Sequence, residues 1–595
     1  MKKTRKLQRI ALITLAVLIT TVALFYLEED WRGKGAWAQR KAELEAKGVA
    51  MDWDKLIPPP VPDDQNFFTA STNILIQFKK AQTKAEREAA EKRPWFRLDW
   101  QSLPIFTTSK TNPLTVAHII VLPPDRAKTH HDRDDAVVLL GEAQAASQME
   151  AALKKTLGRS MVGAAGFKFS ELQLSNLTLC QIWLGSETTP TIADLANLIP
   201  ANLDENLGRL QVVATDDPSK FEVWLIDAKV TTAADYLKFS DQYLPAMDEM
   251  REALKRPYAI LPGDYSEPYM IPIPNFVMLR AASQFLAMRA QCHLLLHDPD
   301  AALPDMTLIH DLCHVLQKPP TGKPETLVEA MINVAISGLY AWTIQDGFQL
   351  GEWREPQLVA LQGQLKTIDL PVWVAEAFRE EFAANVRTLE STPASKIADL
   401  FSGMAPHDKS TNIWSRLNDP LYRFLEFAPR GWIYQNLVNM ANYQPAILKG
   451  FDLEHDKILP RIVDDDDRNA AKFYARKSPF RTLCAFAVPN YTKAMQVTAC
   501  NQTLVNEGQI VCALERYRLK DGDYPAALDA LVPSFIEKLP VDIIGGQPLH
   551  YRRTDDGKFL LYSVGWNEID DGGNAGKKDR DKGVGPSAPD WVWPN

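Results

Sequence analysis

The sequence predicts an α+β multidomain protein. It combines an N-terminal transmembrane helix, an α+β domain, a mostly α-helical middle of helical hairpins or a bundle, and a small C-terminal α+β domain. An uncharged run at residues 10–27 follows a basic leader, strand and helix patterns alternate over residues 95–274, and helical patterns alone fill residues 275–489. At 595 residues, the chain is too long for one hydrophobic core, so several domains are expected.

The N-terminus predicts a membrane anchor. Residues 1–9 form a basic cytoplasmic leader, and the uncharged residues 10–27 span roughly 27 Å as a helix, enough to cross a hydrocarbon core. The basic flank should stay in the cytoplasm, which predicts a single-pass protein of the inner (cytoplasmic) membrane with its bulk in the periplasm or outside the cell. The alternative is a cleaved signal peptide, but no small-x-small cleavage site follows the run.

Residues 28–94 predict a juxtamembrane helix and a linker. A charged helix is expected at 31–47, and a proline-rich joint lies at 57–62. This joint is either an extended spacer that holds the body off the bilayer or a coil packed on the first domain.

Residues 95–274 predict an α+β domain. Strand patterns occur at 114–122 and 167–174, and helix patterns at 141–157 and 231–254. Two further β-rich runs, 210–214 and 221–226, flank an Asp-Asp-Pro-Ser sequence that predicts a hairpin turn.

Residues 275–489 predict a helical domain whose joints carry Pro and Asp. Its expected helices cover residues 276–297, 301–317, 325–348, 355–366, 371–389 and 431–448. None of the six cysteines forms a CxxC pair. Cys292 and Cys313 can meet across a helical hairpin as a disulfide, but buried thiols are the favoured interpretation.

The final unit, 490–595, begins with a long helix at 491–520. Several blocks follow it in order: Gly522-Asp-Tyr-Pro525, Leu539-Pro-Val-Asp542, Gly546-Gln-Pro-Leu-His-Tyr551 and Ser563-Val-Gly565. Over about 500–593 these blocks resemble the soluble domain of type II secretion major pseudopilins. The remainder, including the stretch at 429–436, resembles only uncharacterised bacterial envelope proteins.

The resemblance implies a calcium loop after the Ser-x-Gly block. Its ligands would come from Asn567, Asp570, Asp571 and Asp579, since calcium prefers oxygen ligands. Asn567 stands where that family usually has Asp, and an exposed acidic loop without an ion is the favoured interpretation. The anchor lies nearly 500 residues before this unit, unlike in pseudopilins, so we expect a docking module rather than an assembling pilin subunit.

Other candidate sites are weaker. His293 and His297, and His310 and His314, are each four residues apart on neighbouring predicted helices; together they can hold zinc or copper, but their apolar surroundings favour ordinary half-buried histidines. The charged stretch 130–135 and the aspartate run 464–467 are expected to be a solvated turn and a solvated linker.

These patterns lead to two functional hypotheses. The first is a membrane-anchored extracytoplasmic structural or interaction protein of the bacterial cell envelope, with residues 10–27 in the inner membrane and a protein as its partner. The alternative is an extracytoplasmic hydrolase with carboxylate-based catalysis in the α+β domain. No convincing catalytic constellation stands out, which leaves enzymatic activity open and favours the first hypothesis. The net charge of −9 argues against a nucleic-acid partner.

Overall fold

The structure is a computed structural model. It describes residues 2–78, 120–122, 136–142, 166–174, 177–183, 209–214, 221–226, 233–323, 326–393, 397, 428–476, 478–487, 491–576 and 585–593. The chain divides into two compact units. The first consists of Leu98–Met247 and Met288–Ala302, and the second of Met1–Arg97, Asp248–Ala287 and Leu303–Asn595.

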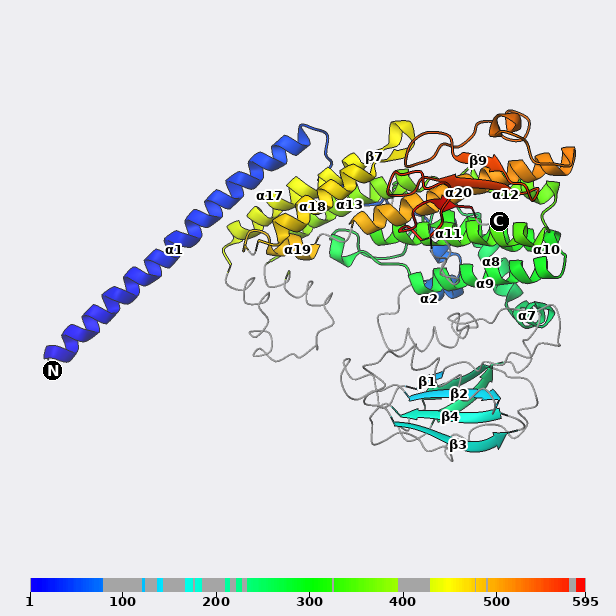
Figure 1. The fold of residues 1–595 in the computed structure, drawn as a ribbon. Helices are drawn as coiled ribbons and strands as arrows, with labels where there is room; N and C mark the ends of the chain where they lie inside the picture. The colour runs from blue at the N-terminus through cyan, green and yellow to red at the C-terminus, as the bar shows by residue number, and fades with distance from the viewer. Residues whose placement is uncertain are drawn as a thin grey trace. The chain divides into compact units, whose positions relative to one another are not determined.

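The first unit is built on antiparallel strands. Its four-stranded sheet has the order β1-β2-β4-β3, and β5 and β6 form a separate pair (Figure 1). The bounds are β1 Ile120–Leu122, β2 Ala136–Glu142, β3 Gly166–Leu174, β4 Leu177–Trp183, β5 Arg209–Ala214 and β6 Phe221–Ile226.

This arrangement confirms the predicted strand at 167–174 and the antiparallel pairing of 210–214 with 221–226. The predicted helix at 141–157 begins within β2, and its remaining residues lie outside the described ones. The charged stretch 130–135 lies outside them too. The predicted helix at 231–254 is broken into α7 (Ala233–Ser240), a 3-10 turn and α8 (Leu244–Leu254).

The second unit is mainly helical, as predicted for the middle of the chain. Helices α9 and α10 contribute to both units. The bounds are α2 Thr72–Phe78, α9 Phe276–Leu295, α10 Pro299–Val315, α11 Leu327–Leu350, α12 Glu355–Leu365, α13 Leu370–Ser391, α17 Arg430–Ile447, α18 Pro460–Tyr474, α19 Thr482–Ala487 and α20 Tyr491–Asp521.

The core of this unit forms around α11 and α20, which lie side by side with α12 (Figure 1). Helix α11 begins at an N-cap where the hydroxyl of Thr326 accepts a hydrogen bond from the Glu329 amide at 3.1 Å. It ends at Gly351, whose φ of 70° suits the left-handed C-cap. Gly338 lies against the side chain of Asn501, so the two helices approach closely.

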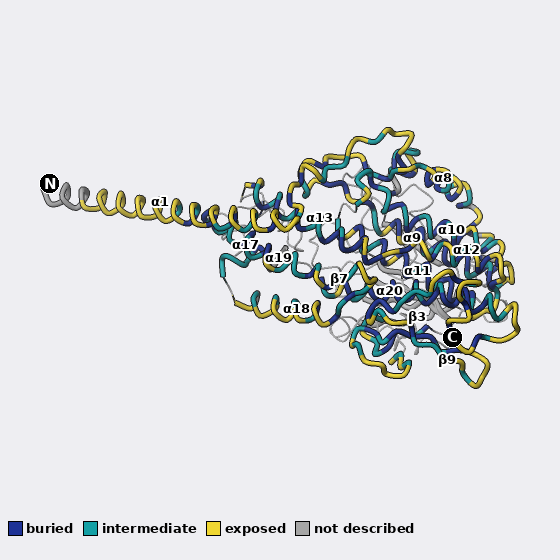
Figure 2. Tube along the Cα trace, turned by 90° about the horizontal axis from the view of Figure 1, so that it is seen from above, coloured by how far each residue is buried: buried dark blue, intermediate teal, exposed yellow. Residues whose placement is uncertain are grey.

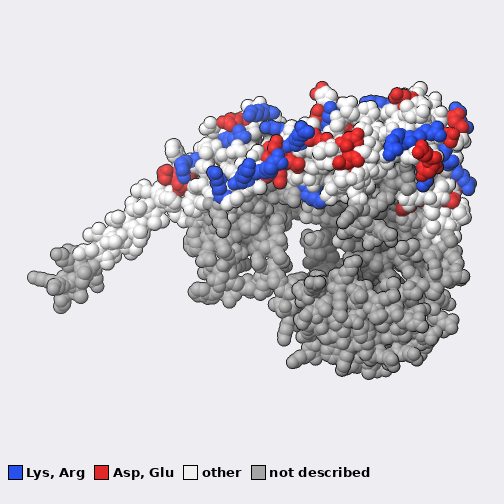
Figure 3. All heavy atoms as spheres, viewed as in Figure 1, with Lys and Arg blue, Asp and Glu red and all other residues white. Residues whose placement is uncertain are grey.

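Helix α1 (Lys2–Glu45) is one continuous helix of 44 residues rather than the two separate helices predicted. Residues 10–27 are exposed almost throughout, and this stretch carries no charged side chain (Figures 2 and 3). It is one of two described helices long and apolar enough to cross a membrane, the other being α11.

The second half of α1 packs on α17. A Cβ atom added at Gly33 would collide with the Gly431 backbone, and one at Gly431 would collide with the Glu29 carbonyl. Asp30 accepts a hydrogen bond from the Gly431 amide at 2.6 Å, and the Glu29 carboxylate accepts one from the Trp432 indole at 2.8 Å. The backbones of the two helices are therefore in contact where they cross, and hydrogen bonds stabilise the crossing.

Further along, α1 enters a hydrophobic core shared with α13 and α17. Trp37 and Leu44 of α1 are buried there with Phe382, Ile433 and Leu437. Trp37 also donates to Glu390, with which Lys41 forms an ion pair at 3.0 Å. The segment that follows residues 10–27 is thus an integral part of the second unit.

Three further predictions can be compared with the structure. Residues 464–467 were expected to be a linker, and that is wrong: they lie inside α18. The proline-rich joint begins packed on the body, where Ile57 contacts the buried cluster of Trp53, Tyr265, Ile271 and Ala383. Cysteines 292, 313, 484, 500 and 512 are buried thiols, as favoured from the sequence.

Candidate functional site

The C-terminal segment supplies a small antiparallel sheet of order β11-β10-β9. Its strands are β9 His550–Arg553, β10 Phe559–Ser563 and β11 Trp591–Val592. Asp542 links two of the sequence blocks, because its carboxylate accepts hydrogen bonds from the Ser563 hydroxyl at 2.8 Å and the Val564 amide at 3.2 Å. Burial raises the pKa of Asp542 despite these donors.

The loop after β10 contains three of the predicted calcium ligands. Asn567 donates to Asp571 at 3.0 Å, so these two side chains meet. Asp570 instead faces the sheet, accepting hydrogen bonds from the Tyr562 hydroxyl and the Gly572 amide, both at 2.9 Å. These two hydrogen bonds lower the pKa of Asp570. Burial and the hydrogen bond to Asp570 raise the pKa of Tyr562 to about 12.

Asp590, which sequence reasoning missed, organises this loop. Its buried carboxylate accepts hydrogen bonds from the amides of Gly573 and Asn574, both at 2.8 Å, and of Asp571 at 3.3 Å. The loop is thereby ordered by a carboxylate of the chain itself. The only sequence signal for this role is its place directly before the apolar Trp591-Val592-Trp593 segment.

Calcium binding at this loop stays a prediction. Asn567, Asp570 and Asp571 are engaged in the hydrogen bonds above, and Asp579 lies outside the described residues. Among the described residues, no group of three or more His, Cys, Asp or Glu side chains is placed to hold a metal ion.

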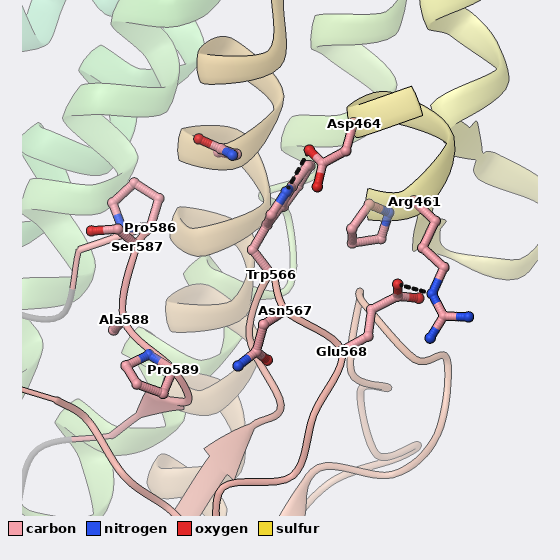
Figure 4. Close-up of a pocket in the computed structure, with 11 residues that line it drawn as sticks. Arg461, Asp464, Trp566, Asn567, Glu568, Pro586, Ser587, Ala588 and Pro589 are labelled. Atoms are coloured by element: carbon pink, nitrogen blue, oxygen red, sulfur yellow. Dashed lines mark hydrogen bonds and ion pairs between the residues drawn. The ribbon is translucent and has the colours of Figure 1, made fainter. Parts of the chain in front are cut away.

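A cleft of about 450 Å³ opens beside the same loop (Figure 4). The N-terminal part of α18 forms one wall, Trp566, Asn567 and Glu568 form another, and a proline-bounded segment closes the third side. The complete lining is Pro460, Arg461, Asp464, Gln496, Trp566, Asn567, Glu568, Pro586, Ser587, Ala588 and Pro589.

Two polar contacts hold the first two walls together. The indole nitrogen of Trp566 donates to Asp464 at 3.0 Å, and Arg461 pairs with Glu568 at 2.8 Å (Figure 4). Asp464 therefore fixes the orientation of the indole, while the Arg461 side chain stays 83% exposed at the rim. The structure thus assigns one aspartate of the supposed linker to the cleft wall.

The lining of this cleft combines apolar and polar groups. A fixed indole, three prolines and an exposed guanidinium offer an apolar surface, rigid edges and one directional cationic donor. Both carboxylates of the lining are already engaged, Asp464 by an indole and Glu568 by a guanidinium.

The remaining predicted residues lie elsewhere. His293 is on α9, where burial lowers its pKa, and His297 follows α9 in the left-handed conformation with φ of 63°. His310 and His314 face each other on α10. The four histidines do not gather into one metal site, since the described residues hold no group of three or more such ligands.

Comparison with known proteins adds no relative. No protein-family model, curated protein or solved structure matches the chain.

Proposed function

We propose that this chain is a membrane-anchored, extracytoplasmic interaction protein of the bacterial cell envelope. Residues 10–27 of α1 would lie in the inner membrane, and a pseudopilin-like C-terminal module would dock a protein partner in the cleft beside α18. The observation that carries this proposal is the division of α1 into an exposed apolar half and a half that packs on α17.

The physical argument begins with solvation. Apolar side chains along residues 10–27, such as Leu12 and Leu18 at 65% and 58% exposure, are unfavourable in water and favourable in lipid. The basic leader favours a topology with the N-terminus in the cytoplasm and the body outside it. Since the helix continues unbroken into contacts with α17, the body is held at the membrane by a rigid link rather than a free tether.

The residues that line the cleft support a protein partner. Trp566 and Arg461 belong to the residue types that dominate protein–protein binding energies. Pro586 and Pro589 bound the segment that closes the third side of the cleft. We infer that the cleft binds a segment of another envelope protein that presents an acidic side chain to Arg461.

The location is tested with the full chain expressed in a Gram-negative bacterium. Protease added to spheroplasts should degrade the body, while intact cells should protect it. Protection in spheroplasts would place the body in the cytoplasm and overturn the proposal.

The docking role is tested separately by photo-crosslinking in the same cells. A photoreactive residue at Ser587, inside the cleft, should give a discrete adduct that Trp566→Ala and Arg461→Glu abolish. The matched control position is Asp555, exposed in the turn between β9 and β10. Equal adducts at both positions, or an adduct indifferent to the two substitutions, would exclude the cleft as the docking site.

A further inference from the structure

Three polar side-chain atoms form a triangle between α10 and the turn after α12, both in the second unit. Their residues are distant in sequence from those that line the cleft. His310 and His314 are one helical turn apart, and their Nε2 atoms are 3.0 Å from each other. The hydroxyl oxygen of Thr367, in the turn after α12, lies 2.9 Å from each Nε2 atom. Three polar atoms from two elements thus converge on one point.

The outer partners of both rings suit one tautomer. Nδ1 of His310 is 3.2 Å from a carboxylate oxygen of Asp311, and Nδ1 of His314 is 2.7 Å from the amide oxygen of Gln317. In the tautomer with both Nδ1 atoms protonated, each ring donates to its outer oxygen and each Nε2 presents a lone pair.

The threonine hydrogen is also directed away. The hydroxyl of Thr367 donates to the carbonyl oxygen of Gln364 at 2.8 Å. In that tautomer, the two Nε2 atoms and the Thr367 oxygen present lone pairs to the same space, 2.9–3.0 Å from one another. Three acceptors without a proton between them repel, and a cation between them removes that repulsion.

The dimensions fit a first-row transition metal. Three atoms about 2.9–3.0 Å apart lie about 1.7 Å from their common centre, so a cation at 2.0–2.1 Å from each sits roughly 1 Å out of their plane. Thr367 is an exposed residue, which gives water access to that corner of the triangle.

We propose that His310, His314 and Thr367 form a binding site for a divalent first-row transition-metal cation. Imidazole nitrogen selects Cu²⁺ and Zn²⁺ over Mg²⁺ and Ca²⁺, and Cu²⁺ binds more tightly than Zn²⁺. Asp311 and Gln317 act as positioning residues that hold the rings in the ligating tautomer.

The test uses the full chain in detergent, stripped with chelator and titrated with Cu²⁺ by calorimetry and electron paramagnetic resonance. The wild type should bind one more equivalent than His310→Gln or His314→Gln, and its spectrum should show two coordinated imidazole nitrogens. Asp311→Asn should weaken binding about tenfold or more without removing a ligand. The matched control is His455→Gln, because His455 is exposed and pairs with Asp452.

The outcomes separate cleanly. Loss of one equivalent in both histidine variants, with His455→Gln unchanged, supports the site. Equal copper binding by the wild type and both variants would reduce the pair to a histidine–histidine contact and overturn the proposal. Melting in chelator shows whether each variant folds, and Asp311→Asn keeps the test informative if a histidine variant does not.

Discussion

Helices α1 and α11 are both long and apolar enough to span a bilayer, yet they have opposite surroundings. None of the most apolar window of α1 is buried, whereas 67% of the corresponding window of α11 is buried inside the protein. Hydropathy therefore identifies helices that avoid water without telling which apolar environment they enter.

Polar side chains make the distinction. In the apolar part of α1, Thr20 and Thr21 donate to the carbonyls four residues earlier, both at 2.8 Å, so their hydroxyls need no outside partner. In α11, Asn333 donates to the Cys313 carbonyl of α10 at 2.9 Å and Ser337 bonds to Asn333. A helix whose polar groups are satisfied by its own backbone suits lipid, while one that needs another element's carbonyl suits a protein core.

The largest expected effect comes from placing a carboxylate in each helix. Val334→Asp buries an unpaired charge at a fully buried site of α11, so we expect the free energy of unfolding to fall by at least about 3 kcal/mol. Leu18→Asp, at an exposed position of α1, should leave the melting of the body unchanged and cost about 2.5–3.5 kcal/mol of membrane insertion. Thermal melting in detergent and the membrane-bound fraction in cells measure the two effects. If both variants melted alike, the contrast between a buried α11 and an exposed apolar part of α1 would be wrong.

A smaller effect should distinguish the two halves of α1. Gly33→Ala forces a methyl group into the Gly431 backbone and should destabilise the contact with α17 by about 1–3 kcal/mol. Gly35→Ala is the matched control: a Cβ there meets nothing within 4 Å, and alanine favours the helix by about 0.5–1 kcal/mol. Melting of the full chain and proteolysis after residue 45 should separate the variants. Equal behaviour of the two would mean that α1 does not dock at Gly33.

The third prediction concerns Glu507, a buried carboxyl group of α20. Glu507 is 1% exposed and its Oε1 has no hydrogen-bond partner among the described residues. Burial, and then the charge of Asp542, raise its pKa well above the usual value. A raised carboxyl pKa means that the folded state binds more protons, so stability falls as pH rises from about 4.5 towards the folded pKa.

We therefore expect the wild type to lose stability with rising pH at up to about 1.4 kcal/mol per pH unit from this group, and Glu507→Gln to melt with a shallower dependence. The control is Glu537→Gln, at an exposed ion pair with Lys366, which should keep the falling slope. Chemical denaturation between pH 5 and 8 measures the slope. An unchanged slope in Glu507→Gln would exclude this carboxyl as its source.

The helical middle could be predicted to within a few residues because its joints carry strong local signals. Asp369 before Leu370-Pro371 caps α13 by accepting from the Val372 amide at 3.3 Å, and Pro356 opens α12. The continuity of α1 could not be predicted, since Glu28-Glu29-Asp30 resembles the end of an anchor. These acidic residues instead supply the contacts with α17.

The site features were harder because they join distant residues. The aspartates of α18 suggested a linker, although Val463 beside them is fully buried and Asp464 orients Trp566 more than 100 residues later. The spacing of His310 and His314 could be read from the sequence. Thr367 could not, because only the fold brings the turn after α12 to α10.

The crossing of Gly33 and Gly431 also fixes the rotational setting of the anchor. Each residue along an α-helix turns by about 100°, so shifting the contact by one residue would swing the membrane-facing surface of α1 through more than a quarter turn. A neighbouring helix that recognises one face of residues 10–27 within the bilayer would therefore always meet the body in the same orientation. In the proposed membrane-anchored arrangement, the glycine pair would couple the rotational setting of residues 10–27 to that of the body.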